Sequence, residues 1–305
     1  MNRRFAIFCP GQGGQHETMF SLAGSAVSPQ LAAVIGSDLA AVISDTSRLF
    51  ANRFAQPLIV ALGMAHWEQL REAIPMPSVI AGYSVGELTA YGVAGALSTA
   101  ELITLAAERA RMMDQCIDPA QPHAMVALSG LTDAAARAIL AARGLYPALI
   151  NGADRMVAGG LRSQCDGIEA QVAALGGSCQ RLPLQVASHT PLLADARAGF
   201  GVALAACHWS DPARPVISGS TAQKISNAVD ARTSLLNQLT SAVQWDSCME
   251  CCVENGIAVT LELGPGNALS RMMRARYPDI ASRAVDEFRS IAAVIGWLRK
   301  ELALP

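Results

Sequence analysis

A serine with the surroundings of a nucleophile lies in the sequence G-Y-S-V-G, which spans Gly82 to Gly86 and fits the pattern G-x-S-x-G. Residues 77–81 ahead of it are typical of a short buried strand, and residues 87–100 behind it are typical of a helix. Strand, sharp turn and helix form the context of a nucleophile elbow. At the head of the helix, backbone N–H groups and the helix dipole can stabilise a developing oxyanion. We therefore expect Ser84 to be a nucleophile.

A serine hydroxyl needs a base to take its proton, and histidine is the usual one. Of the five histidines, His189 follows an expected strand where a small domain would return the chain to a larger one. Clefts form at domain junctions, so we favour His189 over His16, which lies in the first loop. No Asp or Glu between Ser84 and His189 stands out as a third member. The pattern favours a Ser–His dyad, and a structural histidine is the alternative.

Arginine in the helix after the elbow could bind a carboxylate. Arg109 and Arg111 lie in an expected helix at 99–115, where most arginines are solvated surface charges. Arg109 is set among apolar residues, so an inward orientation is the second interpretation. An inward guanidinium would require a carboxylate, and its planar fork suits bidentate binding.

The loop G-Q-G-G-Q at residues 11–15 follows an expected strand at residues 5–9. It matches neither the dinucleotide-binding fingerprint nor the Walker A sequence, so a nucleotide site has little support. A loop at the carboxyl end of a parallel strand would face the same cleft as the elbow.

The elements that position these residues fall into two groups. Strands that alternate with helices indicate a parallel sheet: residues 5–9, 77–81, 215–218 and 259–263. Between them, the order β-α-β-β-α-β is that of a split βαβ, or ferredoxin-like, unit. Its expected strands are residues 124–128, 148–151, 156–158 and 179–186, and its expected helices are residues 132–143 and 165–175. We expect a large α/β domain from residues 1–122 and 189–305, interrupted by a small inserted domain at residues 123–188.

Composition excludes several classes of protein. The 305 residues are 51% hydrophobic and 16% charged, which indicates a buried core rather than disorder. The net charge of −2 provides no basic field for nucleic acid. No apolar run is long enough to span a membrane, and the short N-terminal run is broken at Pro10. We expect a cytoplasmic protein.

Eight cysteines are scattered without the spacing of a disulfide framework, so we expect reduced thiols. Cys248, Cys251 and Cys252 share one face of an expected helix. A zinc site would need a fourth ligand, and no histidine is near in sequence, so we favour a packed helix and predict no metal.

Together these features resemble the malonyl-CoA:acyl carrier protein transacylases, the acyltransferase family of fatty-acid and polyketide synthesis. The resemblance spans essentially the whole chain. Five separated segments carry it: Cys9–Gln15, similar to F-P-G-Q-G-S-Q; Gly82–Glu87, similar to G-H-S-L-G-E; Val186–His189, the catalytic-histidine segment; Val243–Trp245, similar to P-V-Q-W; and Glu262–Leu269, similar to E-x-G-P-G-x-x-L.

The resemblance implies a role for each matched residue. Ser84 would be the nucleophile and His189 its base. The Gln12 region and the Val85 N–H would form the oxyanion hole, and Gln244 would help to orient His189.

The resemblance also implies an α/β-hydrolase-like core with an inserted ferredoxin-like subdomain. Arg109 would bind the malonyl carboxylate. The substrate would be malonyl-CoA with no bound cofactor, and the partner would be an acyl carrier protein whose thiol accepts the malonyl group.

Departures from the family pattern suggest a branch. Tyr83 stands in place of histidine, Val85 in place of leucine, and Cys9 in place of phenylalanine. The form G-Y-S-V-G-E resembles the malonate decarboxylase epsilon subunit, which loads a dedicated carrier-protein subunit. Other decarboxylase subunits would then be partners, and fatty-acid or polyketide synthesis is the alternative setting.

Two competing functions use the same residues. A serine hydrolase or thioesterase would replace the carrier thiol by water, but it would want an acidic third member and would leave Arg109 without a role. A non-catalytic subunit would keep the fold only to dock a carrier protein.

Overall fold

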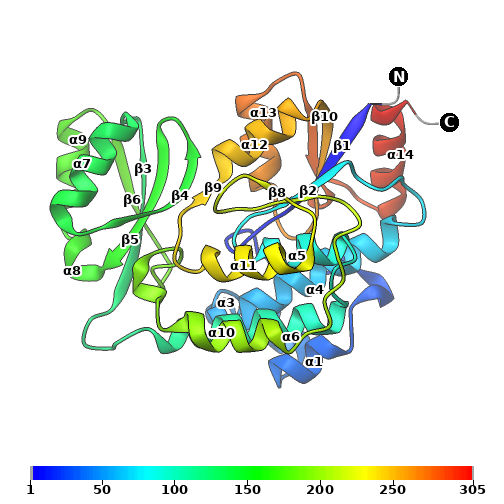
Figure 1. Cartoon of the computed structure of the whole chain (residues 1–305), viewed down its shortest axis with the longest axis horizontal. Coiled ribbons are helices and arrows are strands. Elements are labelled where there is room, and N and C mark those ends of the chain that lie inside the picture. Colours follow the sequence, from blue (N-terminus) through cyan, green and yellow to red (C-terminus); the bar gives the residue numbers. More distant parts are fainter. Residues whose placement is uncertain (1–2, 304–305) are drawn as a thin grey trace.

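The computed structural model describes residues 3–303 and contains two β-sheets, each with its own helices (Figure 1). The larger sheet has the strand order β11-β10-β1-β2-β7-β8, and all its pairings are parallel except that of β8 with β7. Its strands are β1 (Arg4–Cys9), β2 (Val79–Gly82), β7 (Val216–Ile217), β8 (Lys224–Ile225), β10 (Ile257–Glu262) and β11 (Ala281–Ala284).

Strand β1 lies in the middle of this sheet and is buried on both faces. Ile7 and Cys9 face one hydrophobic core, whereas Ala6 and Phe8 face the other. A parallel strand covered by helices on both sides is apolar at successive positions. The continuous apolar run at the start of the sequence is therefore a central strand.

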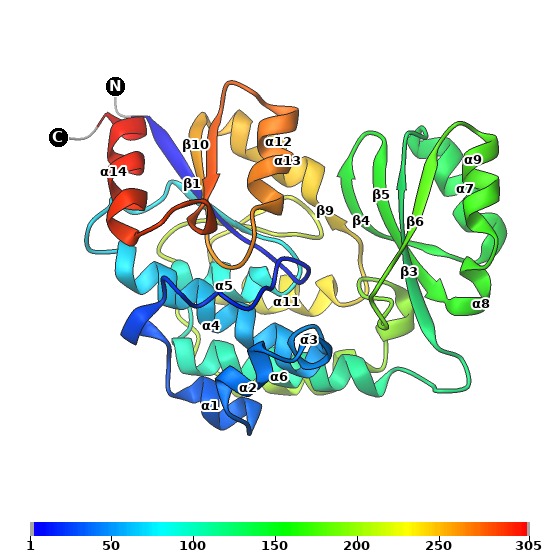
Figure 2. The same ribbon diagram turned by 180° about the vertical axis from the view of Figure 1, so that it is seen from behind.

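Helices cover both faces of the larger sheet (Figures 1 and 2). α4, α5, α6, α10 and α11 lie on one side, and α12 and α13 lie on the other, with α14 against α4 and β10. Their bounds are α1 (Gln30–Ile35), α2 (Leu39–Ile43), α3 (Thr46–Leu49), α4 (Asn52–Leu70), α5 (Gly86–Val93), α6 (Thr99–Gln115), α10 (Ala196–Ala205), α11 (Ala228–Gln238), α12 (Trp245–Glu254), α13 (Ala268–Arg276) and α14 (Ile291–Leu302).

The smaller sheet has the strand order β6-β3-β5-β4-β9. Its first four strands come from a continuous segment of β-α-β-β-α-β order, in which the second helical part consists of two short helices. The elements are β3 (His123–Ser129), α7 (Asp133–Arg143), β4 (Tyr146–Gly152), β5 (Arg155–Leu161), α8 (Arg162–Cys165), α9 (Ile168–Ala174) and β6 (Ser178–Leu182). A parallel core with a small ferredoxin-like unit confirms the predicted fold class. The exact domain boundaries stay a prediction, because β9 (Val243–Gln244) joins this sheet from outside residues 123–188.

Three elements differ from the sequence expectation. The helix after the elbow ends at Val93 rather than near residue 100, because Gly95 adopts a left-handed conformation. The helix expected at 165–175 is broken at Gly167, which is also left-handed. β6 ends at Leu182 rather than at residue 186, so the segment before His189 is a loop.

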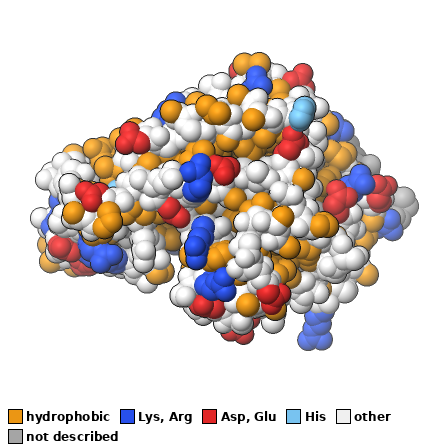
Figure 3. Space-filling model, turned by 90° about the horizontal axis from the view of Figure 1, so that it is seen from below, with side chains coloured by type: hydrophobic (Ala, Val, Ile, Leu, Met, Phe, Trp, Pro, Cys, Tyr) orange, Lys and Arg blue, Asp and Glu red, His pale blue; other side chains and the backbone are white. Residues whose placement is uncertain are grey.

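On the face seen from below, basic, acidic and hydrophobic side chains are interspersed (Figure 3). Within residues 3–303 no group of three or more His, Cys, Asp or Glu side chains is placed to hold a metal ion. Cys248 and Cys252 lie on the inner face of α12, and their side chains are buried in the hydrophobic core. No helix in the described part of the chain is both long and apolar enough to cross a membrane.

We predict that Gly86 is required for the junction of β1 and α5. A Cβ at this position would overlap the carbonyl oxygen of Cys9, so Gly86→Ala should lower the free energy of unfolding by about 3 kcal/mol. Gly296 in α14 is a matched control because a Cβ there meets nothing within 4 Å. Gly296→Ala should stabilise the protein by up to about 1 kcal/mol. Urea denaturation measures both, and equal effects of the two substitutions would contradict the proposed packing constraint.

Candidate active site

Ser84 lies on the turn between β2 and α5 with φ at 56°, in the left-handed region. This conformation costs a non-glycine residue about 1–2 kcal/mol. A Cβ at Gly82 would overlap the backbone of Glu87, and one at Gly86 would overlap the carbonyl oxygen of Cys9. The two glycines therefore allow β1, β2 and α5 to meet at the serine.

His189 is in hydrogen-bond contact with Ser84. Its Nε2 atom lies 2.8 Å from the Ser84 Oγ, and its Nδ1 atom lies 2.7 Å from the carbonyl oxygen of Gln238. A carbonyl can only accept, so Nδ1 carries the proton and Nε2 accepts the hydroxyl of Ser84. His189 is also left-handed, with φ at 62°, and its side chain is buried. The structure thus brings together the serine and histidine that the sequence paired.

The protonation state of His189 suits a base. Burial, followed by the positive charge of Arg109, lowers the pKa of His189 to about 3, although the hydrogen bond to Gln238 opposes this shift. The ordinary histidine pKa is about 6.5. The imidazole is therefore neutral at physiological pH, with its Nε2 lone pair available for the Ser84 proton.

His16, the alternative base, lies in a different contact. Its Nε2 atom is 2.7 Å from the Asp286 Oδ2, and its Nδ1 atom is 3.1 Å from the Thr18 Oγ1. Both ring nitrogens are therefore engaged away from Ser84.

The expected contact between Gln244 and His189 is not found within residues 3–303, and Gln238 takes that place. The Gln244 side chain donates to the carbonyl oxygen of Ala242 at 3.5 Å. Gln244 belongs to β9, whose pairing with β4 fixes its backbone. Gln238 is the last residue of α11, and the last carbonyls of a helix have no partner within the helix. Its carbonyl oxygen is therefore free to accept the His189 Nδ1–H.

Arg109 points inward from α6 and is only 2% exposed. Its Nη1 donates to the Gln56 Oε1 at 2.8 Å, and its Nη2 donates to the Gln238 Oε1 at 3.3 Å. Both partners are neutral amides, so three of the five guanidinium N–H donors remain outside these two contacts. Burial lowers the pKa of Arg109 to about 10, although the charge of Glu87 opposes this shift. The side chain is therefore a buried cation at neutral pH.

Glu87 supplies the nearby negative charge. Its carboxylate accepts hydrogen bonds from the Gly219 N–H and the Ser234 Oγ, both at 2.9 Å, and from the Gln238 Nε2. Burial raises the pKa of Glu87, and the three donors together with Arg109 oppose this shift. Three donors directed at one carboxyl group favour its ionised form. The expected carboxylate is thus linked to Arg109 through the amide of Gln238 rather than by direct contact.

Two segments that border Ser84 contain the backbone N–H groups of Val85 and Gln12, which the sequence predicted to form an oxyanion hole. Val85 begins the turn into α5, and the glycine loop after β1 lies beside it. A Cβ at Gly11 would be 3.3 Å from the Ser84 Cβ, so this loop lies directly against the serine. Among the described residues, neither the Val85 N–H nor the Gln12 N–H donates a hydrogen bond.

The residues that sequence reasoning missed are Gln56, Gln238 and the structural role of Glu87. Glu87 had a signal, because it directly follows the elbow and lies in an apolar stretch. The two glutamines had none, since glutamine in a helix is usually exposed. Their burial follows only from the packing of α4, α6 and α11.

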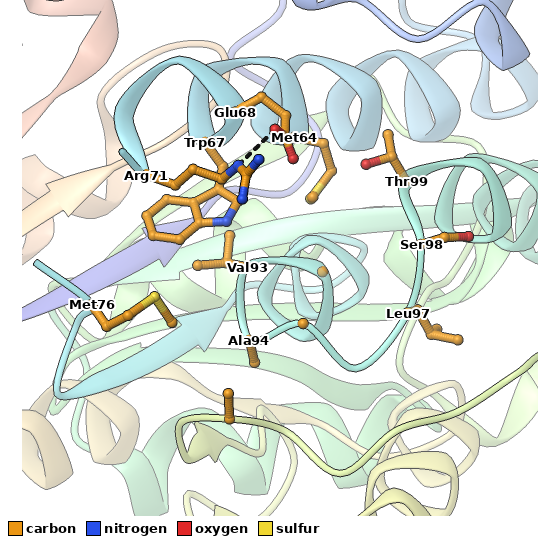
Figure 4. Close-up of a pocket in the computed structure, with 13 residues that line it drawn as sticks. Met64, Trp67, Glu68, Arg71, Met76, Val93, Ala94, Leu97, Ser98 and Thr99 are labelled. Atoms are coloured by element: carbon orange, nitrogen blue, oxygen red, sulfur yellow. Dashed lines mark hydrogen bonds and ion pairs between the residues drawn. The ribbon is translucent and has the colours of Figure 1, made fainter. Parts of the chain in front are cut away.

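A separate cavity of about 410 Å³ lies at the other end of α5 from Ser84 (Figure 4). Trp67 and Val93 contribute apolar walls, and an ion pair of 2.8 Å joins Glu68 to Arg71 at its edge. Its lining contains neither histidine nor cysteine. The nucleophile and base lie elsewhere, so the candidate active site is the contact between Ser84 and His189.

Comparison with known proteins shows the family of this chain. Residues 8–304 match the family model described as the acyl transferase domain. The malonyl CoA-acyl carrier protein transacylase of Mycobacterium tuberculosis is 32% identical over 299 residues, which cover 92% of this chain and 95% of that protein.

Solved structures show the same fold. The malonyl CoA-acyl carrier protein transacylase from Coxiella burnetii superposes with a TM-score of 0.92 at 27% identity, covering 99% of this chain and 98% of that one. A malonyl-transacylase in complex with a type II PKS acyl-carrier protein gives a TM-score of 0.89 at 25% identity, with 96% and 99% coverage. Because the family model spans nearly the whole chain, the protein belongs to the acyl transferase domain family.

Proposed function

We propose that this protein transfers a malonyl group from malonyl-CoA, through an ester on Ser84, to the thiol of an acyl carrier protein. The observation that carries the proposal is a buried cation, Arg109, close to a serine–histidine pair. The names of the related proteins support malonyl-CoA as donor and a carrier protein as acceptor.

Acylation begins when the neutral His189 takes the Ser84 proton at Nε2. The Ser84 oxygen attacks the thioester carbonyl, and the N–H groups of Val85 and Gln12 bind the resulting oxyanion. Collapse breaks the C–S bond, and the CoA thiolate leaves with the proton from His189. The carrier thiol then gives its proton to His189, and its sulfur attacks the carbonyl carbon of the Ser84 ester. Collapse breaks the C–O bond to Ser84, whose oxygen takes the proton back from His189, and the malonyl group remains on the carrier sulfur.

Arg109 would select the acyl group by its charge. The guanidinium donors left outside its two amide contacts can bind the free carboxylate of a malonyl group. An acetyl group offers no charge, so it would leave this buried cation unmatched. Leaving a buried donor set unpaired costs about 2–5 kcal/mol, which suffices for strong discrimination.

Two metabolic settings use this reaction. The relatives are named as transacylases, which supports fatty-acid or polyketide synthesis better. The malonate decarboxylase setting rests on the form G-Y-S-V-G-E, in which Tyr83 and Val85 stand in place of histidine and leucine. In the structure the Tyr83 hydroxyl donates to the Asn151 Oδ1 at 3.0 Å and so ties the elbow to the smaller sheet.

We expect malonyl-CoA to add one malonyl group to the protein at Ser84, as measured by intact mass spectrometry and peptide mapping. Ser84→Ala should remain unmodified because the nucleophile is absent. The absence of any adduct on the wild-type protein would favour a non-catalytic carrier-docking subunit. An adduct that decays rapidly in water without a thiol acceptor would favour a hydrolase.

Arg109→Ala should reduce the preference for malonyl-CoA over acetyl-CoA by about thirtyfold or more, because the buried cation is lost. Some acetyl transfer should remain, since Ser84 and His189 are retained. Arg111→Ala is the matched control from the same helix, because that side chain is half exposed and pairs with Glu108 at the surface. Rates of acyl–Ser84 formation with each thioester measure the effect. Equal losses with both thioesters would count against carboxylate recognition.

Acylation should keep its rate at low pH. His189 accepts a proton only while it is neutral, and its pKa is lowered to about 3. The value of kcat/KM should therefore stay level from pH 8 to about pH 5, where an ordinary histidine would already be mostly protonated. A stopped-flow pH profile of acylation checks this, and a half-maximal rate near pH 6.5 would show that His189 is not held in this environment.

A further inference from the structure

The loop after β10 lies against the glycine loop that borders Ser84. A Cβ at Gly14 would be 2.5 Å from the carbonyl oxygen of Pro265, and a Cβ at Gly266 would be 3.0 Å from the Gly14 Cα. The two backbones are therefore in direct contact. The sequence G-P-G at 264–266 matched a family motif, yet the mechanism above gives it no task.

The loop at 264–267 is itself held firmly. The Gly266 N–H donates to the Asp286 Oδ2 at 2.6 Å, and the Asn267 side chain donates to the Glu287 Oε1 at 3.3 Å. From beneath, the Gly264 N–H donates to the Nδ1 of the buried His66 at 3.2 Å. Burial lowers the pKa of His66 to about 4, so its neutral ring can accept this bond. The loop is a fixed surface on which the glycine loop rests.

His16 closes the contact from the other side. It directly follows the glycine loop, and its Nε2 lies 2.7 Å from the same Asp286 oxygen that binds the Gly266 N–H. One carboxylate oxygen therefore joins both loops. The Oδ2 of Asp286 is the only atom among the described residues that accepts from both His16 and Gly266.

We propose that His16 and Asp286 are positioning residues that clamp the glycine loop, and with it the Gln12 N–H, at the distance that an oxyanion requires. The proposal rests on the proposed function, in which that N–H binds the oxyanion. Among the described residues, the side chains of His16 and Asp286 form no hydrogen bond with Ser84 or His189. We therefore expect them to act through the backbone of residues 11–15.

The contact between His16 and Asp286 should affect the rate of acylation more than the free energy of unfolding. The two side chains are 40% and 20% exposed, and even a charged pair that is partly exposed contributes only about 0–1 kcal/mol to folding. An oxyanion donor, by contrast, must lie within a few tenths of an ångström of its target, and complete loss of one donor costs about 10²–10³ in rate. A small increase in the mobility of the glycine loop should therefore lower the rate of the chemical step.

The test uses the intact protein and five variants, one of which is the double variant that combines His16→Ala with Asp286→Ala. His16→Ala removes one arm of the clamp, and Asp286→Ala releases both loops. His16→Gln keeps a hydrogen-bond donor toward Asp286 and should therefore preserve the wild-type exchange, labelling and acylation rates. Asp246→Ala is the matched control, because Asp246 forms a pair of 2.9 Å and similar exposure with Arg276, away from the glycine loop.

Three readouts separate the clamp from the proposed function. Hydrogen exchange reports the mobility of amides 11–15. A fluorophosphonate probe reports on the oxyanion hole whatever the natural substrate is. Ser84 attacks its phosphorus and fluoride leaves, while the phosphonyl oxygen occupies the oxyanion position. Single-turnover acylation by malonyl-CoA reports the rate at saturation and the half-saturating concentration.

We expect His16→Ala and Asp286→Ala to speed exchange in residues 11–15 and to slow both labelling and acylation about tenfold. The half-saturating malonyl-CoA concentration should change less than about twofold, and the double variant should lose no more than Asp286→Ala alone. His16→Gln and Asp246→Ala should behave like the wild type.

Wild-type labelling rates in His16→Ala and Asp286→Ala would overturn the clamp, as would an equal loss in Asp246→Ala. If the wild-type protein takes up no malonyl group while labelling and exchange still respond as expected, the proposed function fails and the clamp stands.

Discussion

The buried charges of Glu87 and Arg109, bridged by the amide of Gln238, are the constraint on which the site depends. A lone ion in the interior would be prohibitively unfavourable, so each charge requires the other and the amide that links them. Gln238 also holds His189 in place, because its backbone carbonyl oxygen accepts the His189 Nδ1–H. The proposed carboxylate-binding group, Arg109, and the proposed base, His189, therefore share one support at the end of α11.

The larger sheet brings the remaining parts to one edge. β1, β2 and β10 are parallel neighbours in close register, with Cys9 opposite Gly82 and Phe8 opposite Glu262. Their carboxyl ends must then lie side by side, which is where open α/β sheets bind ligands. The glycine loop leaves β1, the elbow leaves β2, and the G-P-G loop leaves β10. Contact among these three loops is a consequence of strand order, and glycine is needed where their backbones meet.

The parts of this arrangement that could be predicted from sequence are those with local signals. The elbow around Ser84, the core strands and the β-α-β-β-α-β unit follow from apolar periodicity and glycine spacing. Gln244 illustrates the limit, because a motif match placed it on His189 whereas tertiary packing assigns that task to a backbone carbonyl of Gln238. Backbone acceptors carry no side-chain signature, and the joining of β9 to the smaller sheet is likewise a long-range pairing.

Backbone geometry also explains why the reactive pair is strained. Ser84 and His189 are both left-handed, at φ values of 56° and 62°, although such conformations are rare outside glycine. Each costs about 1–2 kcal/mol, which must be offset by surroundings that permit no alternative. For the serine these are the glycine contacts of the elbow, and for the histidine they are its buried hydrogen bond to Gln238. Relaxing either residue to an extended conformation would redirect its side chain and separate Oγ from Nε2. The strain therefore arises because the loop after β2 in the larger sheet and the loop after β6 in the smaller sheet must direct Ser84 and His189 toward each other to form a single hydrogen bond.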